Sequence, residues 1–338
     1  MSDLSKAFEQ LRKENVQFIA VANSEWYSLF RDEIRNSIAI EGIFTNRNEL
    51  LDVLERNKRT SDEKTAAILG YFESASFVYE YANNLYKENE FIIRLSDIKQ
   101  IHTLLMRYEH QLGSFSGVLG DFRKEDVEVT HSTFTPVKAI YIPDAMRLLV
   151  KWINEKLTDD DYDKIKLATA SHIIFETIHP FRDGNGRVGR ILLSFLLIGT
   201  GFVNIAIKGT NREQREKYYT AMEAADDEIE RMLRDIERGK KVTSQSVDQY
   251  LANSDVTLLE AIIRDRLSDA FERLKSKEML TFNKEAILPL RDAARFFNYS
   301  QDYLRNLINK NKLRAMKKGK LWYVKVRDVE RYIEDQAK

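Results

Sequence analysis

A twelve-residue stretch from His179 to Arg190 constrains the fold of this 338-residue chain more than any other feature. It reads His-Pro-Phe-Arg-Asp-Gly-Asn-Gly-Arg-Val-Gly-Arg. Pro180 disfavours the right-handed helical conformation at His179, so a helix that covers Ile165–Ile178 is predicted to end there. The apolar run Ile191–Ile198 predicts a buried helix directly after the stretch. We therefore expect a glycine-rich loop between two helices.

The residues of this loop are those of an anion site. Gly184 and Gly186 let backbone amides turn inward, and a helix start behind such a turn attracts phosphate groups. Arg187 and Arg190 lie three apart on one face of the first turn, where each cation opposes the helix dipole at a cost of up to about 1 kcal/mol. A bound polyanion would remove that conflict. Asp183, an acid among these cations, is explained by a divalent ion that bridges it to phosphates.

Composition indicates a globular protein of two or three domains, because 43% of the residues are hydrophobic and 31% are charged. The chain has no cysteine, which excludes disulfides and thiolate metal sites and fits a reducing compartment. With 13 glycines and 4 prolines, few tight turns and mostly helix are expected. No apolar run is long enough to span a bilayer and no signal peptide is visible at the start. We expect a cytoplasmic protein with no membrane partner.

The stretch resembles the signature of the Fic family, His-x-Phe-x-Asp/Glu-Gly-Asn-Gly-Arg-x-x-Arg, at every fixed position. The resemblance implies that His179 is a general base, for which an imidazole pKa near about 6.5 is suited. It would deprotonate a target hydroxyl that attacks the α-phosphate of ATP. The product would be AMP on Ser, Thr or Tyr, with pyrophosphate released. Phe181 would anchor the loop in the core. The other implied roles are Mg²⁺ binding by Asp183, phosphate contacts by Gly184, Asn185 and Gly186, and outer-phosphate contacts by Arg187 and Arg190.

A second motif lies near the start of the chain. Apolar residues recur at helical spacing over Glu25–Glu41, and Gly42 is placed to end that helix. Ser37 and Glu41 are four apart and share a face. Their Ser-x-x-x-Glu-Gly pattern resembles the inhibitory motif of Fic proteins that carry their own brake. The resemblance implies that Glu41 pairs with Arg190 and occupies the space of the γ-phosphate. The alternative is a solvated glutamate at a helix end.

The segments between the two motifs complete the expected catalytic core. Helical patterns cover Asp52–Lys58, Thr65–Lys87 and Ser96–His110. A short β-hairpin is predicted from residues 121–129 and 133–141. In the Fic family the corresponding stretch is a flap that docks the target segment as an added strand, so we expect the target on residues 129–141. The Gly120-x-x-Arg123 pattern also resembles a Fic feature just before the flap.

Four other histidines are expected to carry no chemistry. His131 is predicted to be a solvated loop residue, and His172 a buried structural residue two turns before the motif. His102 and His110 are interpreted as structural or surface residues. No His-x-x-x-His pattern or carboxylate cluster has ligand spacing, so zinc is not expected.

Two tyrosines follow the buried helix in the segment Asn211–Met222. Their Arg-x-x-Tyr-Tyr pattern resembles the segment of Fic proteins near the nucleobase. Tyr218 or Tyr219 would pack on adenine, although either is equally compatible with the core.

The C-terminal part differs in charge from the rest. Residues 281–338 contain 14 Lys/Arg and 7 Asp/Glu, a net +7, whereas the other residues carry −7. A linker begins near Arg238, and Leu258–Leu274 is predicted to be a connector helix or an oligomer contact. Two short helices in Leu288–Ile308, followed by a hairpin and a last helix from Val329, resemble an excisionase-type winged helix-turn-helix.

This module suggests a partner. The side chains of Arg305, Asn306 and Asn309 would face a major groove. Phosphates would be met by the basic hairpin residues Lys317, Lys318 and Lys320. DNA binding through residues 288–326 is therefore expected, with protein docking as the alternative.

Together these features predict a mainly α protein: a Fic helical core with a short β-hairpin flap, followed by a winged helix-turn-helix. The expected divisions are residues 1–95 (helical region with the inhibitory helix at about 25–42), 96–240 (catalytic core), 241–280 (linker and connector) and 281–338 (winged module). The predicted function is a self-inhibited protein adenylyltransferase that uses ATP and Mg²⁺ and also labels itself. A deAMPylase in which Glu41 orients water, and a nucleotide-sensing DNA-binding regulator, are alternatives. The oligomeric state stays open, with a homodimer as one option.

Overall fold

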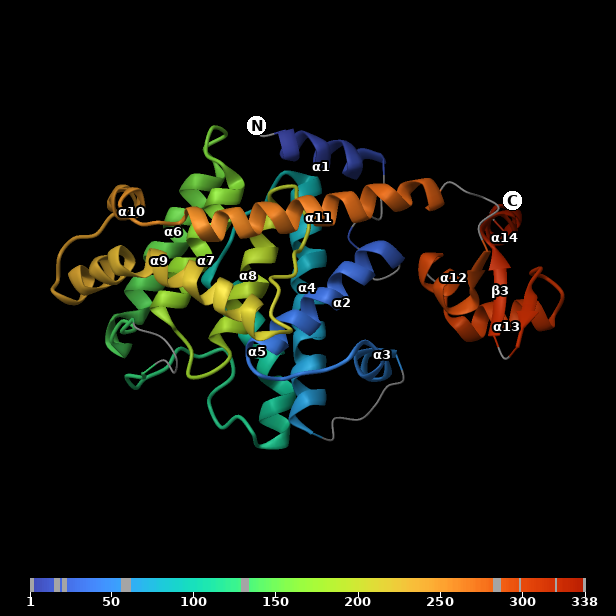
Figure 1. The fold of residues 1–338 in the computed structure, drawn as a ribbon, viewed down its shortest axis with the longest axis horizontal. Coiled ribbons are helices and arrows are strands. Elements are labelled where there is room, and N and C mark those ends of the chain that lie inside the picture. Colours follow the sequence, from blue (N-terminus) through green and yellow to red (C-terminus); the bar gives the residue numbers. More distant parts are fainter. Residues whose placement is uncertain are drawn as a thin grey trace. The chain divides into compact units, whose positions relative to one another are not determined.

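The computed structural model describes residues 3–14, 19, 23–55, 62–128, 134–281, 287–297, 299–319 and 321–336, and these are mainly helical (Figure 1). In chain order the elements are α1 (Asp3–Glu14), α2 (Ser24–Ile40), α3 (Arg47–Glu55), α4 (Glu63–Glu88), α5 (Leu95–Leu112), the 3₁₀ turn η1 (Ala139–Tyr141), α6 (Ile142–Leu157), α7 (Lys164–Ile178), α8 (Asn185–Gly199), α9 (Arg212–Glu237), α10 (Ser244–Ala252), α11 (Thr257–Thr281), β1 (Ile287–Pro289), α12 (Leu290–Phe296), α13 (Gln301–Asn309), β2 (Met316–Lys318), β3 (Leu321–Lys325) and α14 (Val326–Gln336).

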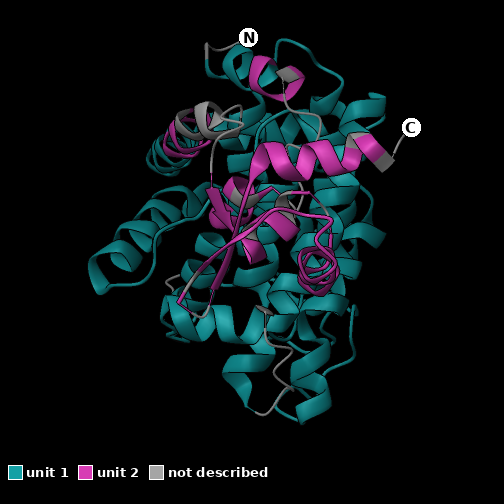
Figure 2. Ribbon diagram, turned by 90° about the vertical axis from the view of Figure 1, so that its right-hand side faces the viewer, with its two compact units in different colours: residues 1–9, 30–268 teal, residues 10–29, 269–338 magenta. Residues whose placement is uncertain are grey.

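The chain divides into two compact units, coloured separately in Figure 2. Unit 1 contains residues 1–9 and 30–268, and unit 2 contains residues 10–29 and 269–338. Helices α1, α2 and α11 each cross a unit boundary. Across the described residues, no helix combines the length and the apolar composition that crossing a membrane requires.

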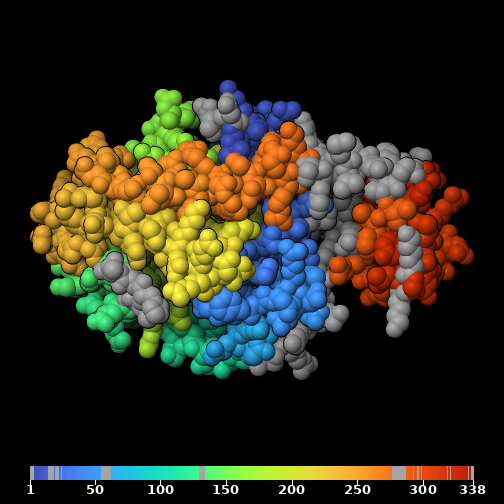
Figure 3. Space-filling model, in the orientation of Figure 1, coloured from blue at the N-terminus to red at the C-terminus, as the bar shows by residue number. Residues whose placement is uncertain are grey.

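The core of unit 1 is built around α7 and α8. Both helices are buried along almost their whole length, and α8 packs against α4, α5 and α7. Helices α4 and α5 approach closely because Gly70 has no side chain: a Cβ there would lie 2.0 Å from Leu105 O. The loop that joins α7 to α8 is thus fixed at both ends by buried helices. Helix α9, in yellow in Figure 3, contributes to the surface of this unit.

Side-chain caps set several helix starts. Asp62 accepts from Thr65 N at 2.8 Å at the start of α4, and Asp163 accepts from Ile165 N at 2.8 Å at the start of α7. Gly42 has φ 81 and follows the end of α2, as the sequence predicted. The predicted helices are present, although α3 begins at Arg47 and residues 56–58 of its predicted range lie outside the described part. Helices α1, α6, α9 and α10 had not been predicted.

The predicted β-hairpin before α6 is wrong for the residues that the structure describes there. Residues 121–128 and 134–138 are not strands, and residues 129–133, with His131, lie outside the described part. The amides that a hairpin would pair are instead bound to carboxylates. Thr135 N donates to Glu230 Oε1 at 2.5 Å and Lys138 N donates to Glu237 Oε1 at 2.7 Å, both on α9.

Unit 2 contains a winged helix-turn-helix, as predicted. Its sheet has the order β1-β3-β2 with antiparallel pairing, in which Leu288 faces Val324 and Lys317 faces Trp322. Strand β1 is an addition to the prediction. The core of the module joins both short helices to the sheet and to α14. It consists of Leu290, Ala293, Ala294, Leu304, Leu307, Ile308, Leu313, Val324 and Val329.

Candidate active site

The loop between α7 and α8 begins with a left-handed residue. His179 follows α7 with φ 52 and ψ 60, which turns the chain out of the helix as Pro180 predicts. Phe181 is fully buried, and its ring stacks on His102 with centroids 4.0 Å apart. The Asn185 side chain holds the loop with two hydrogen bonds, because it donates to Phe181 O and accepts from Phe181 N, each at 2.8 Å. The Asn185 side chain is therefore used inside the loop, and the phosphate contact that the family resemblance implied for Asn185 stays a prediction.

The glycines form a turn at the start of α8. Gly184 has φ 78, and its amide donates to Asp183 Oδ1 at 2.5 Å. The amides of the first helical turn have no partner within the helix, so they can bind an anion. A Cβ at Gly186 would lie 2.5 Å from Glu41 Oε1 and 3.1 Å from Arg190 Nη1. The Glu41 carboxylate thus lies directly against this turn.

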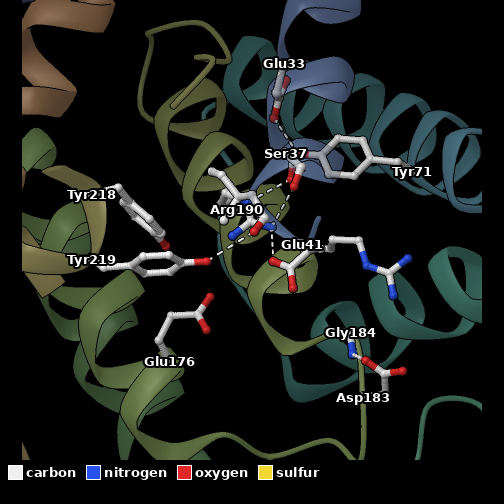
Figure 4. A network of polar contacts seen from close by, with 12 residues as sticks. Glu33, Ser37, Glu41, Tyr71, Glu176, Asp183, Gly184, Arg190, Tyr218 and Tyr219 are labelled. Carbon is white, nitrogen blue, oxygen red and sulfur yellow. Dashed lines mark hydrogen bonds and ion pairs between the residues drawn. The ribbon is translucent and has the colours of Figure 1, made fainter. Parts of the chain in front are cut away.

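Arg190 joins α8 to the end of α2, as Figure 4 shows. Its Nε donates to Ser37 Oγ at 2.7 Å and its Nη2 donates to Ser37 O at 3.1 Å. Nη2 also lies 2.5 Å from Glu41 Oε1. The guanidinium side chain is 4% exposed and the Glu41 side chain 36% exposed. The predicted contact between Glu41 and Arg190 is confirmed.

Arg187 has a different carboxylate partner. Both of its terminal nitrogens donate to Glu109 near the end of α5, Nη2 at 3.2 Å from Oε2. This pair is buried, with side-chain exposures of 6% and 10%. Nothing in the local sequence marks Glu109, because its partner lies 78 positions away. The two arginines of the motif are therefore each held by a glutamate from another helix.

A third glutamate anchors α2. Glu33 lies one turn before Ser37 on α2 and is 2% exposed. Its carboxylate accepts from Tyr71 and Tyr79 on α4, Ser194 on α8 and Asn204. The distances are 3.0 Å from Tyr71 Oη, 3.0 Å from Ser194 Oγ and 2.8 Å from Asn204 Nδ2. Glu33, Ser37 and Glu41 thus form a ladder along one face of α2.

Burial and charge shift the ionisation of these groups. Desolvation raises the pKa of the Glu41 carboxyl, but Arg190, together with Arg187 and His179, lowers it by more, so that the net shift is downward. Burial raises the pKa of Glu33 to about 7 and that of Glu176 to about 8. Burial lowers the pKa of His179 to about 4, so the imidazole is neutral at pH 7. Its Nδ1 lies 3.3 Å from Glu176 O, which only accepts, and this leaves the Nε2 lone pair free to take a proton.

The two tyrosines of α9 differ in position. Tyr218 is buried, with its hydroxyl 2.7 Å from His172 Nε2, so it belongs to the core. Tyr219 is 40% exposed and its hydroxyl donates to Ile40 O at 3.1 Å, beside the end of α2 (Figure 4). His172 and His102 are fully buried, which confirms their structural assignment, and His110 is exposed.

Asp183 is the acidic side chain that the loop offers to a cation. It is exposed, and one of its oxygens accepts from Gly184 N. Mg²⁺ typically takes one or two carboxylates together with substrate phosphates and water, so this single carboxylate beside an anion turn fits that ion. Among the residues that the structure describes, no three or more His, Cys, Asp or Glu side chains are grouped as a metal site.

Comparisons with known proteins agree with this geometry. Residues 92–197 match the model of the Fic/DOC family, and residues 288–337 match a helix-turn-helix domain. A probable protein adenylyltransferase of Aquifex aeolicus is 28% identical over 314 residues, 92% of this chain and 89% of that protein. The protein adenylyltransferase Fic of Aedes aegypti is 26% identical over 73% of this chain, which spans 48% of that relative. A Fic domain containing signaling protein from Bacteroides thetaiotaomicron has the same fold, with a TM-score of 0.60, 19% identity and coverage of 81% of this chain and 97% of that one.

Proposed function

Because residues 92–197 are a Fic/DOC domain and residues 288–337 a helix-turn-helix domain, we propose that this protein is a nucleotidyltransferase that transfers AMP from ATP to a protein hydroxyl. Relatives named as protein adenylyltransferases support the reaction class. The observation that carries the proposal is the neutral His179 imidazole beside a glycine turn and two arginines. The Glu41 carboxylate lies against this turn and pairs with Arg190.

The reaction follows from these positions. His179 Nε2 takes the proton of a Ser, Thr or Tyr hydroxyl, and the oxygen attacks the α-phosphorus of ATP. The bond from that phosphorus to the oxygen bridging to the β-phosphate breaks, and pyrophosphate leaves. The turn at Gly184 and Gly186 and the guanidinium group of Arg190 bind the phosphates. Arg187, which is paired with Glu109, contributes its positive charge to the same site. Asp183 would hold Mg²⁺, which supplies charge neutralisation on the leaving phosphates.

In this proposal, Glu41 inhibits AMP transfer. Its carboxylate lies against Gly186 and on Arg190, where the outer phosphate of ATP would bind. Two anions cannot share that guanidinium in a buried site without strong repulsion. Productive ATP binding therefore requires Glu41 to leave Arg190.

Labelling with ATP that carries ³²P at the α-phosphate, in the presence of Mg²⁺, tests both the proposed AMP transfer and its proposed inhibition by Glu41. The samples are wild type, Glu41→Gly, the double variant Glu41→Gly/His179→Ala and the control Glu88→Gly. Glu88 is also an exposed acid, at the end of α4. Self-labelling is expected in Glu41→Gly alone. Label in the double variant would contradict the role of His179, and label in none would contradict the transferase.

Removal of AMP is a second candidate, favoured by one observation. Arg190 keeps the pKa of the Glu41 carboxyl below its usual value, and Glu41 is close enough to His179 to raise the pKa of that imidazole. An ionised carboxylate there can orient a water molecule. Glu41→Gly would then free transfer and abolish removal of AMP from a labelled protein. Incubation of purified AMP-labelled protein with each form measures this directly.

The winged module is proposed to bind DNA. Arg305, Asn306 and Asn309 are exposed on α13, and Lys317 lies 5.5 Å from the Trp322 ring on the hairpin. Affinity for duplex DNA should fall with rising salt, and Lys317→Ala should lower the slope of log affinity against log salt by about one phosphate contact. Binding that is indifferent to salt would favour a protein partner. If the protein represses transcription and His179→Ala retains that repression, a nucleotide-sensing DNA-binding regulator would be favoured over the transferase.

A further inference from the structure

One buried cation is not used by the chemistry above. Arg123 lies between α5 and η1 and is 6% exposed. Its Nε donates to His179 O at 2.8 Å, and its backbone amide donates to Pro180 O at 2.9 Å. Two consecutive carbonyl groups of the active-site loop are thus bound by this one residue.

The same guanidinium also binds the segment before η1. Nη1 donates to Glu125 O at 2.9 Å, and Nη2 donates to Val137 O. Glu125 and Val137 lie on either side of residues 129–133, and Val137 is buried. A single side chain therefore joins the loop that carries His179 to one residue within the expected docking segment, Val137, and to one residue before it, Glu125.

Carbonyl oxygens, rather than a carboxylate, satisfy this cation. The nearest ion pair is with Asp126 Oδ1 at 3.9 Å from Nη1, and Asp126 is mostly exposed. Burial lowers the pKa of Arg123, which is the mark of a cation held in the interior at a cost. Three carbonyls in three directions require the planar, multi-donor guanidinium, and a lysine ammonium does not reproduce that geometry.

The loop needs such a support. His179 has a left-handed backbone, which non-glycine residues adopt rarely, and it precedes a proline. Its amide closes α7 by donating to Phe175 O at 3.0 Å, whereas its carbonyl points away from the helix to Arg123. The orientation of the imidazole follows from this backbone.

We propose that Arg123 is a positioning residue that sets the backbone of His179 and the target-docking segment relative to one another. This inference rests on the proposed transferase function. A target bound on the expected docking segment, residues 129–141, is then placed at a fixed distance from the imidazole. Its hydroxyl meets Nε2 without a search over loop conformations.

The test uses the full chain with Glu41→Gly as parent, combined with Arg123→Met, Arg123→Lys or the control Arg264→Met. Arg264 is a partly buried arginine paired with Asp163, at the opposite end of α7 from His179. Arg123→Met should lower the maximal rate of self-labelling by about 100-fold while the dissociation constant for ATP and Mg²⁺ stays unchanged. Arg123→Lys should fail to restore the rate, and Arg264→Met should match the parent. A full rate in either Arg123 variant, or a matching loss of ATP affinity, would overturn the proposal.

A measurement without turnover separates this proposal from the transferase itself. Histidine ring signals are recorded by NMR against pH, and His179 is assigned from its loss in His179→Ala. Arg123→Met should move the His179 signal and raise its pKa above about 4, while the His172 signal stays unchanged. Thermal melts confirm that each variant is folded, and Arg123→Lys is used if Arg123→Met does not fold. A His179 signal and pKa identical to the parent would overturn the positioning role even if no form of the protein labels itself.

Discussion

Replacement of Glu41 by glycine should lower the stability of the free protein and strengthen nucleotide binding. The change leaves Arg190, 4% exposed, with only Ser37 among the partners described for it on α2. Loss of one partner from a fully buried pair costs about 3–5 kcal/mol, and from a surface pair about 0–1 kcal/mol. Because the Glu41 side chain is 36% exposed, water can reach the guanidinium, and we take an intermediate value of about 2 kcal/mol.

That energy also opposes ATP in the wild type. If Glu41 must leave Arg190 before ATP binds, the cost of about 2 kcal/mol makes the apparent affinity of wild type for ATP about 30-fold weaker. The free Glu41→Gly variant should melt about 4 °C below wild type, at about 2 °C per kcal/mol for a chain of this size. At 100 times its dissociation constant, ATP adds about 2.7 kcal/mol, or about 5 °C. The same ATP concentration adds only about 0.9 kcal/mol to wild type, because its affinity is about 30-fold weaker, so the two melting temperatures should become nearly equal.

The assay is a thermal melt of wild type, Glu41→Gly, Glu41→Gln and the control Glu88→Gly, each with and without ATP and Mg²⁺. Glu41→Gln keeps the side-chain length and should resemble Glu41→Gly in its response to nucleotide. Glu88→Gly should respond like wild type. Equal nucleotide shifts in wild type and Glu41→Gly would refute the reasoning, because they would mean that Glu41 does not compete with phosphate.

Three further outcomes are expected. Glu33→Ala removes the carboxylate that accepts from four donors and so weakens the attachment of α2. Self-labelling should therefore be higher in Glu33→Ala than in wild type. If Glu33→Ala also raised self-labelling in the Glu41→Gly protein, its effect would not act through Glu41. Gly186→Ala places a Cβ in the anion turn, so the Glu41→Gly/Gly186→Ala protein should lose ATP binding by calorimetry, and retained affinity would exclude this turn as the phosphate site. The pKa of Glu176 is raised by burial from 4.5 to about 8, so the stability linked to its protonation is present below pH 4.5 and is lost as pH rises through 8. Glu176→Gln should therefore stabilise the protein more at pH 8 than at pH 4 in thermal melts, and an equal effect at both pH values would contradict this pKa.

The active-site loop and the helix that carries Ser37 could be predicted because their signals are local. Pro180 and the glycines act on the backbone of their own segment, and the helical spacing of Ser37 and Glu41 places both on one face. The bounds of α2, α4, α5 and α7 followed from local sequence signals in the same way, to within two residues. The contact from Glu41 to Arg190 required the family resemblance, because the two residues are 149 positions apart.

The contacts that were missed are tertiary. Glu109 and Glu33 are buried acids on helices, and neither spacing nor composition indicates which donors surround them. The error in residues 121–141 has a similar cause. A short β-hairpin was expected there, but carboxylates of α9, about a hundred positions later, bind backbone amides that a hairpin would use. Hydrogen bonds to side chains so far away in the sequence cannot be predicted from the local sequence, because they depend on how the helices pack.

The most direct test of the central claim asks which phosphate faces His179. The Glu41→Gly protein is incubated with Mg²⁺ and with ATP labelled either at the α-phosphate or at the γ-phosphate, and protein-bound label is counted. The account predicts that label enters the protein from the α position and that the γ label leaves as pyrophosphate. Covalent label from the γ position, or none from the α position, would contradict it.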